Sequence, residues 1–175
     1  MADDTIELSM SELREVAGYA VACARPALAI YERDRPDDPR PRAAIDAAAA
    51  FADGGKRTKA IRDGAWHALR AAGEARDAGQ EAASDAARAA VAAASAAYLH
   101  PLAKATQVKH ILGSAAHAAC AFELADGDDP AGHLTRAQHL ATPAVRDVLR
   151  RYPPAPSGGA RAGELIRRLD AALRA

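Results

Sequence analysis

Residues 98–122 hold most of the side chains in this chain that could do chemistry. Three of the six histidines and two of the four lysines lie around one strongly periodic helical pattern: His100, Lys104, Lys109, His110 and His117. An imidazole can bind a metal or exchange a proton near neutral pH, and a lysine ammonium can hold an anion. The cluster is therefore a metal site, an anion or small-molecule site, a surface that contacts a partner, or a set of packed side chains.

The spacing of the histidines does not favour a metal. His110 and His117 are seven residues apart, whereas metal-binding pairs on helices usually have i, i+4 spacing, and a third ligand would still be needed. No His-Glu-x-x-His, Cys-x-x-Cys or Glu-x-x-His pattern occurs in the chain. We expect no metal and no cofactor. We interpret the histidines as partly buried and hydrogen-bonded, with contact to a ligand or partner as the alternative.

Two basic clusters could converge on an anion if the helices that carry them are neighbours. The first cluster, at the start of one expected helix, contains Lys56, Lys59 and Arg62. The second adds Gln107 to the lysines and histidines named above. On an ideal helix, however, Lys104 and Lys109 would lie about 140° apart, since each residue turns the helix by about 100°. A shared pocket would need walls from other helices, so we expect a packed His110 and at least one solvated lysine.

Known catalytic motifs are missing from the sequence. It contains no Ser-His-Asp signal, no Gly-x-Ser-x-Gly elbow and no Gly-x4-Gly-Lys-[Ser/Thr] loop, which argues against the common hydrolases and ATPases. We therefore assign no catalytic residue and favour a binding surface over an active site. An anion- or small-molecule-binding protein, including an enzyme of an unfamiliar kind, is the alternative.

The composition excludes several classes of partner. The 23 acidic residues balance the 23 basic ones and aromatic residues make up 4% of the chain, so neither nucleic acid nor an anionic membrane is favoured. The alanine-rich run 86–99 carries Arg88 and is too weakly apolar to span a membrane. The chain opens Met-Ala-Asp-Asp without a signal-peptide pattern, and Cys23 and Cys120 are isolated. We expect a cytoplasmic protein with reduced, buried thiols.

The periodicity predicts an all-α fold, a single-domain multi-helix bundle over residues 1–175 with a central helix around 102–125. Capping residues, prolines and glycines divide the chain into expected helices at about 10–33 (kinked at Pro26), 41–52, 56–74, 78–98, 102–125, 130–140, 143–151 and 161–173. About 50 residues are alanine, so large side chains must anchor the core. We expect four such anchors: Trp66, Phe51, Phe122 and Leu112.

Two segments resemble a known family. Arg35-Pro-Asp-Asp-Pro-Arg-Pro-Arg-Ala-Ala-Ile-Asp46 resembles its opening, and Tyr98-Leu-His-Pro-Leu-Ala-Lys-Ala-Thr-Gln-Val-Lys-His-Ile-Leu-Gly113 resembles its central helix. This is the Imm-five-like "putative immunity protein" family of bacterial polymorphic toxin systems, and the resemblance covers about residues 10–125. It implies an all-α cytoplasmic protein that neutralises a toxin domain by protein–protein interaction. It brings no catalytic motif and leaves the oligomeric state open. The helices in 130–174 are expected to pack on the region of resemblance.

Overall fold

Helices make up nearly all of the regular structure in the computed structural model, which describes residues 4–175. The first three residues of the Met-Ala-Asp-Asp opening lie outside the described part. Nine α-helices and two short 3₁₀ turns follow one another: α1 (Met10–Ala24), η1 (Arg25–Ala27), α2 (Leu28–Asp34), α3 (Arg40–Ala52), α4 (Lys59–Asp77), α5 (Glu81–Ala96), η2 (Ala105–Gln107), α6 (Val108–Asp126), α7 (Pro130–Leu140), α8 (Pro143–Arg150) and α9 (Ala160–Arg174). Within residues 4–175 the only strand-like pairing is one isolated bridge, Thr5 to Leu102. The predicted all-α fold is confirmed.

The helix ends follow the local chemistry of the sequence. Ser9 accepts a hydrogen bond from the backbone of Glu12, whose carboxylate accepts one from the Ser9 backbone, so α1 begins with a complete capping box. Asp129 and Thr142 cap α7 and α8, each followed directly by a proline. The expected kink at Pro26 is the 3₁₀ turn that separates α1 from α2.

The predicted start of the central helix at residue 102 is wrong. Residues 101–103 are extended and pair with the N-terminal arm: the backbone N–H of Ile6 donates to the carbonyl of Pro101, and that of Ala103 donates to the carbonyl of Asp4, both over 2.9 Å. A pairing with residues almost a hundred positions earlier cannot be read from local periodicity. The helix α6 therefore begins only at Val108.

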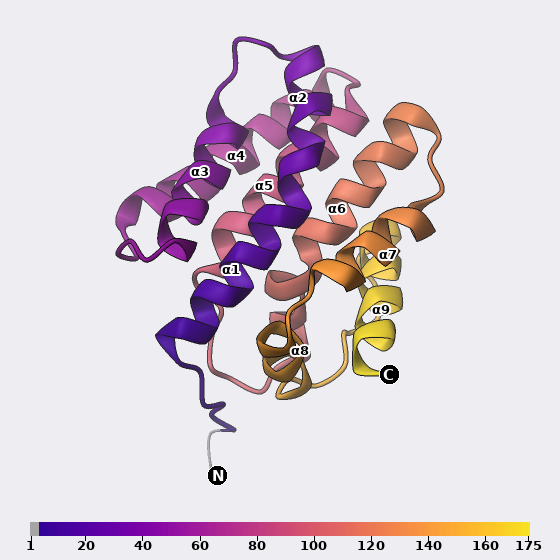
Figure 1. Cartoon of the computed structure of the whole chain (residues 1–175). Coiled ribbons are helices and arrows are strands. Elements are labelled where there is room, and N and C mark those ends of the chain that lie inside the picture. Colours follow the sequence, from indigo (N-terminus) through magenta and orange to yellow (C-terminus); the bar gives the residue numbers. More distant parts are fainter. Residues whose placement is uncertain (1–3) are drawn as a thin grey trace.

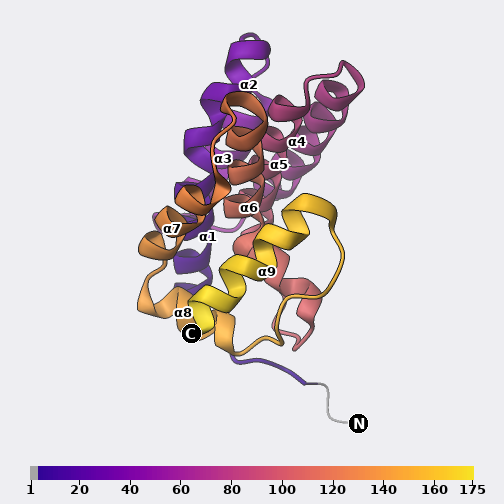
Figure 2. The ribbon, with the colours of Figure 1, turned by 90° about the vertical axis from the view of Figure 1, so that its right-hand side faces the viewer.

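Helix α5 lies at the centre of the bundle. It packs most extensively on α4 and α6, and α1, α2 and α3 cover another side of it, while α9 packs on α6 (Figures 1 and 2). The buried face of α5 is built almost entirely of alanine, which lets neighbouring helices approach closely. The close approach of α3 and α4 is seen at Gly64 of α4, where an added Cβ would lie 3.3 Å from the Cα of Ala44 in α3.

The prediction that Trp66 anchors the core is wrong, because 63% of its surface is exposed. Ile61 and four alanines form the buried face of α4, and Trp66 lies on the opposite side of that helix. Phe51 and Leu112 are buried as expected. Phe122 is only half-buried and stacks on His133, with the two ring centroids 4.5 Å apart.

The C-terminal helices are tied to the rest of the bundle. Arg151, just after α8, forms an ion pair with Glu12 of α1 at 2.6 Å, and the Tyr152 hydroxyl donates to the carbonyl of His100 over 2.7 Å. Leu165, Leu169 and Leu173 of α9 are fully buried. Among the described residues, no helix is long and apolar enough to cross a membrane. Cys23 and Cys120 are buried free thiols, as expected.

Candidate functional site

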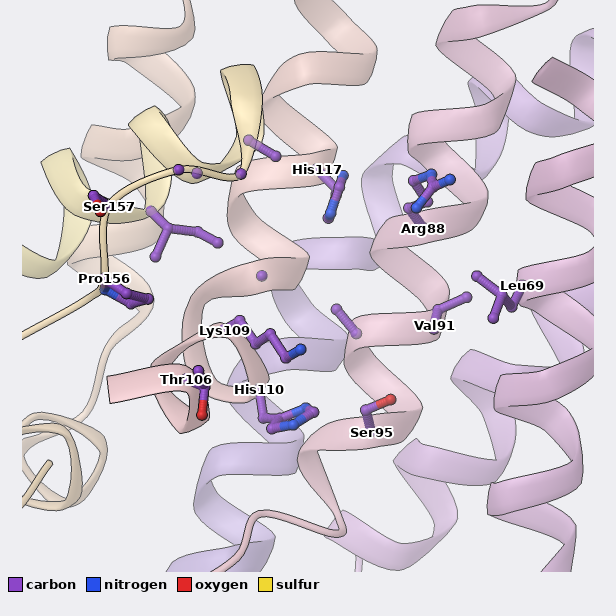
Figure 3. A pocket seen from close by; sticks show the side chains of 17 residues that line it. Leu69, Arg88, Val91, Ser95, Thr106, Lys109, His110, His117, Pro156 and Ser157 are labelled. Atoms are coloured by element: carbon purple, nitrogen blue, oxygen red, sulfur yellow. The ribbon is translucent and has the colours of Figure 1, made fainter. Parts of the chain in front are cut away.

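Two adjoining cavities, of about 620 and 380 Å³, form a continuous groove along α5. They share Leu69, Val91, Ser95 and His110, and we call the combined depression the α5 groove. Its floor is the half-buried stripe of α5, bordered by α4 on one side and α6 on the other, and residues 156–166 line the larger cavity on the side of α6 away from α5 (Figure 3). The side chains that line the groove include Arg62, Trp66, Leu69, Arg88, Val91, Tyr98, His100, Lys109, His110, His117 and Ile166.

The α6 wall carries three of the residues that sequence reasoning singled out. Lys109, His110 and His117 all line the larger cavity, and Figure 3 shows Lys109 and His110 extending from α6 toward α5. Helices α4 and α5 supply other walls, so these three α6 residues can line one pocket. His110 also lines the smaller cavity and so lies where the two cavities meet.

The two histidines of this wall differ in their surroundings. His117 Nδ1 lies 2.8 Å from a carboxylate oxygen of Asp85 on α5, so this pair joins the two helices. Burial, followed by the positive charge of Lys109, lowers the pKa of His110 to about 4. His110 is therefore a neutral imidazole at physiological pH.

The α4 wall is apolar with a cationic end. Trp66 and Leu69 are one helical turn apart and both exposed, at 63% and 38%. The guanidinium carbon of Arg62 lies 5.0 Å from the ring centroid of Tyr98, within the range of a cation–π contact, and both residues line the smaller cavity. The Tyr98 hydroxyl donates to the carbonyl of Thr58, which holds the ring in place.

The end of the larger cavity is a rigid turn that leads into α9. Gly158 and Gly159 both have positive φ angles, of 87° and 77°. Arg167 fixes this turn by donating to the carbonyls of Pro156 (3.2 Å) and Gly158 (2.7 Å). A bidentate ion pair between Arg161 and Glu123 of α6 holds the start of α9 against the wall.

Other predicted site residues lie outside the groove. Lys104 is exposed and lines neither cavity, and Gln107 accepts a hydrogen bond from the backbone of His100 over 3.0 Å, so it shapes the loop. Lys56 and Lys59 are exposed at the start of α4, where Lys59 pairs with Asp63 at 3.5 Å. His100 does line the smaller cavity.

Sequence reasoning considered Arg62 only as part of the basic cluster with Lys56 and Lys59, and it missed four other α4 and α5 residues of the groove: Trp66, Leu69, Arg88 and Val91. A signal was present, because the alanines of α4 recur on one face and leave Trp66 and Leu69 together on another. The size of Trp66 suggested a core position, but a core of alanines has no room for it.

The formally charged side chains that line the groove are all basic. Arg62, Arg88 and Lys109 line it, and no carboxylate does. Within residues 4–175 none of these three cations forms an ion pair, whereas several other arginines do, including Arg40, Arg151 and Arg161. The nearby carboxylate of Asp85 is engaged by His117. The groove can therefore hold a group that is both acidic and apolar.

The site region holds a histidine–carboxylate pair but, among the described residues, no cluster of metal ligands. Over residues 4–175, no group of three His, Cys, Asp or Glu side chains could hold a metal ion. His117 and Asp85 form an imidazole–carboxylate pair, but in the described part of the chain no hydroxyl or thiol is hydrogen-bonded to it. Burial raises the pKa of Cys23 and of Cys120 to about 12, which leaves both thiols protonated and unreactive.

A family model matches residues 7–142, more than half of the chain, and its description is Imm-5 like putative immunity protein. The chain belongs to this family. The match covers α1 to α7, whereas α8, α9 and the turn that closes the groove lie beyond it. No curated protein and no solved structure matches the chain significantly.

The two motifs that resemble this Imm-5 like family have different roles in the structure. The first, Arg35–Asp46, holds the turn between α2 and α3: Asp38 accepts hydrogen bonds from Tyr31 (2.6 Å) and Arg40 (2.7 Å), and Arg40 also pairs with Glu74 of α4. These hydrogen bonds hold the pKa of Asp38 far below its usual range, and those from Arg40 have the largest effect. The second motif, residues 98–113, builds the α6 wall of the groove.

Proposed function

We infer that this protein neutralises a bacterial toxin domain by binding it. Membership of the Imm-5 like putative immunity protein family supports a binding role of this kind. The geometric observation that supports it most is Trp66, the only tryptophan of the chain, which stands exposed beside Leu69 on the wall of a groove. Tryptophan is among the residues that contribute most to protein–protein interfaces, so an exposed one is a natural anchor for a partner.

A growth assay tests this function. The product of the gene next to that of this chain, which the proposal expects to carry the toxin domain, is expressed in a bacterial host from an inducible promoter, with and without this chain. The expected result is growth arrest by the toxin domain alone and growth with both proteins, together with a complex that survives gel filtration. Arrest that continues in the presence of well-expressed folded chain would contradict the proposed function.

A second candidate function is the binding of an anionic small molecule in the larger cavity. The observation in its favour is that Arg88 and Lys109 reach this cavity together with His117 and without a carboxylate in its lining. A thermal-shift screen of inorganic phosphate, nucleotides and divalent metals, on wild type and Lys109→Ala, separates the two functions. Stabilisation of the wild type alone, with micromolar affinity by calorimetry, would favour the small molecule.

A further inference from the structure

We propose that the α5 groove is the surface that receives the toxin domain, and that its occupant is an acidic segment of that domain carrying at least one large apolar side chain. This inference rests on the proposed function, to which it adds a location and the chemistry of the partner. The apolar content, the unpaired charges and the shape of the groove support it independently.

The apolar content is concentrated on one wall. Only four large hydrophobic side chains of residues 4–175 are exposed, and two of them, Trp66 and Leu69, are neighbours on α4. Val91 on the floor and Ile166 at the far end are half-buried and continue the apolar surface along the groove. An apolar side chain of a partner could therefore contact the Trp66 ring and the floor together, and a contact area of this kind is typical of the buried centre of an interface.

The charges on the rim determine the kind of segment that fits. Arg62 lies at one end of the groove and Arg88 and Lys109 lie farther along it, so cations are distributed over its length. None of them has a carboxylate partner in the described part of the chain, although the chain as a whole has no net charge. Carboxylates of a partner would complete these pairs, whereas a basic segment would leave like charges facing one another.

The shape of the groove favours a segment of a folded partner over a small ion. The two cavities together run from the start of α4 to the start of α9, and they adjoin at four shared residues. An inorganic anion could contact Lys109 and Arg88 but would leave Trp66 and Leu69 exposed. A helix or loop of a toxin domain would cover both the apolar wall and the cationic rim.

Calorimetry with matched variants tests the location. The probe is an inactivated variant of the neighbouring gene's product that is used in the growth assay. Trp66→Ala is compared with Leu124→Ala, because Leu124 is also exposed, at 52%, but lies outside the groove. We expect Trp66→Ala to weaken binding about 30-fold or more, as at other interface anchors, and Leu124→Ala to leave the affinity unchanged.

A second pair of variants tests the charge. Lys109→Glu is compared with Lys104→Glu, since both lysines are exposed but only Lys109 lines the groove. We expect Lys109→Glu to weaken binding about tenfold, mainly through slower association, and Lys104→Glu to have a much smaller effect. The loss should shrink as the salt concentration rises, because ions screen an exposed pair.

The outcomes separate the two proposals. If the wild-type chain neither binds the toxin domain nor protects cells, the proposed function fails and this inference fails with it. If the chain binds and protects but Trp66→Ala and Lys109→Glu bind within about threefold of wild type, only the inference is overturned. It is also overturned if Trp66→Ala converts a wild-type dimer into a monomer.

Discussion

Trp66 is the residue on which sequence and structure differ most. A tryptophan among alanines looks like an anchor for a core that is short of bulk, yet the core is built from close contacts between small side chains. The large residues that are fully buried come from other places, among them Tyr31, Phe51 and Tyr152. An exposed tryptophan in such a protein does not serve folding, and this is why it is informative about binding.

The exposure of Trp66 predicts how little its loss should cost in stability. We expect Trp66→Ala to lower the free energy of unfolding by less than about 1 kcal/mol, as for a surface substitution. Truncation of a buried tryptophan usually costs about 3–5 kcal/mol. Urea denaturation followed by circular dichroism measures the difference, and a loss in the range of a buried anchor would place the ring in the core.

His110 predicts a dependence of stability on pH. Its pKa is about 4 in the folded protein, lowered by burial and by Lys109, against the ordinary value of 6.5. Between these two pH values the unfolded chain binds a proton that the folded chain does not, so stability falls as the pH is lowered from about 6.5 to 4. This one group contributes a fall of about 1–3 kcal/mol.

The variant His110→Gln removes this contribution. Its free energy of unfolding should change less than that of wild type between pH 7 and pH 4.5, as measured by urea titrations at several pH values. Parallel curves for the two proteins would show that His110 is as solvated in the folded state as in the unfolded one.

At the scale of the helices, close approach through small residues sets the stability. Two glycines of α4 form a natural comparison. A Cβ at Gly73 would meet nothing within 4 Å, whereas one at Gly64 would lie 3.3 Å from the backbone of α3 at Ala44. Both glycines lie inside the same helix, so the intrinsic preference of alanine over glycine is the same at the two sites.

Substitution of these glycines by alanine should therefore have different results. We expect Gly73→Ala to raise the free energy of unfolding by about 0.5–1 kcal/mol through helix propensity. Gly64→Ala should show none of this gain, since the added methyl group presses on the α3 backbone. Equal stabilisation of both variants in thermal or urea unfolding would indicate that α3 and α4 are farther apart than the structure has them.

Much of the helical organisation could be predicted from the sequence, and the reasons are local. The Ser9 capping box, the prolines after Asp129 and Thr142 and the break at Pro26 act within a turn of the chain, and the helix starts at residues 10, 130 and 143 agree with the expected ranges. The extended segment 101–103 could not be predicted, because its hydrogen bonds are with residues 4–6. Long-range pairing has no signature in local periodicity.

The candidate site was predicted only on its α6 side. His100, Lys109, His110 and His117 do line the groove, but Lys56, Lys59, Lys104 and Gln107 do not. The α4 wall was missed because a groove depends on which helices are neighbours, and this follows from packing. Arg88 was considered only as a charge within the alanine-rich run 86–99, which is too weakly apolar to span a membrane. Nothing in the local sequence indicates that Arg88 lines the same cavity as Lys109 and His117.

At the scale of the whole molecule, the groove combines two parts of the chain. The α4, α5 and α6 walls belong to residues 7–142, which the family model matches, and the turn before α9 lies beyond them. Arg167 holds that turn through its hydrogen bonds to Pro156 and Gly158. The end wall of the groove is therefore supplied by a segment outside the family match.

This arrangement predicts a local effect of Arg167→Met. Loss of two hydrogen bonds, each worth about 0.5–1.5 kcal/mol, should speed amide exchange several-fold in residues 157–160 while α1 to α3 stay unchanged. Arg168→Met is the matched control, because Arg168 is the next residue and is exposed. Hydrogen–deuterium exchange with mass spectrometry distinguishes the two variants. Identical exchange would mean that the turn is held by other contacts.

The most direct test of toxin binding in the α5 groove uses Trp66 itself as the reporter. Because it is the only tryptophan of the chain, incorporation of 5-fluorotryptophan gives a single ¹⁹F resonance that the unlabelled toxin domain does not obscure. We predict that this resonance shifts as the inactive toxin domain is titrated in, saturates at the stoichiometry found by calorimetry, and becomes less sensitive to exchange of H₂O for D₂O. A toxin domain that binds by calorimetry while the resonance keeps its position and its solvent sensitivity would contradict the account.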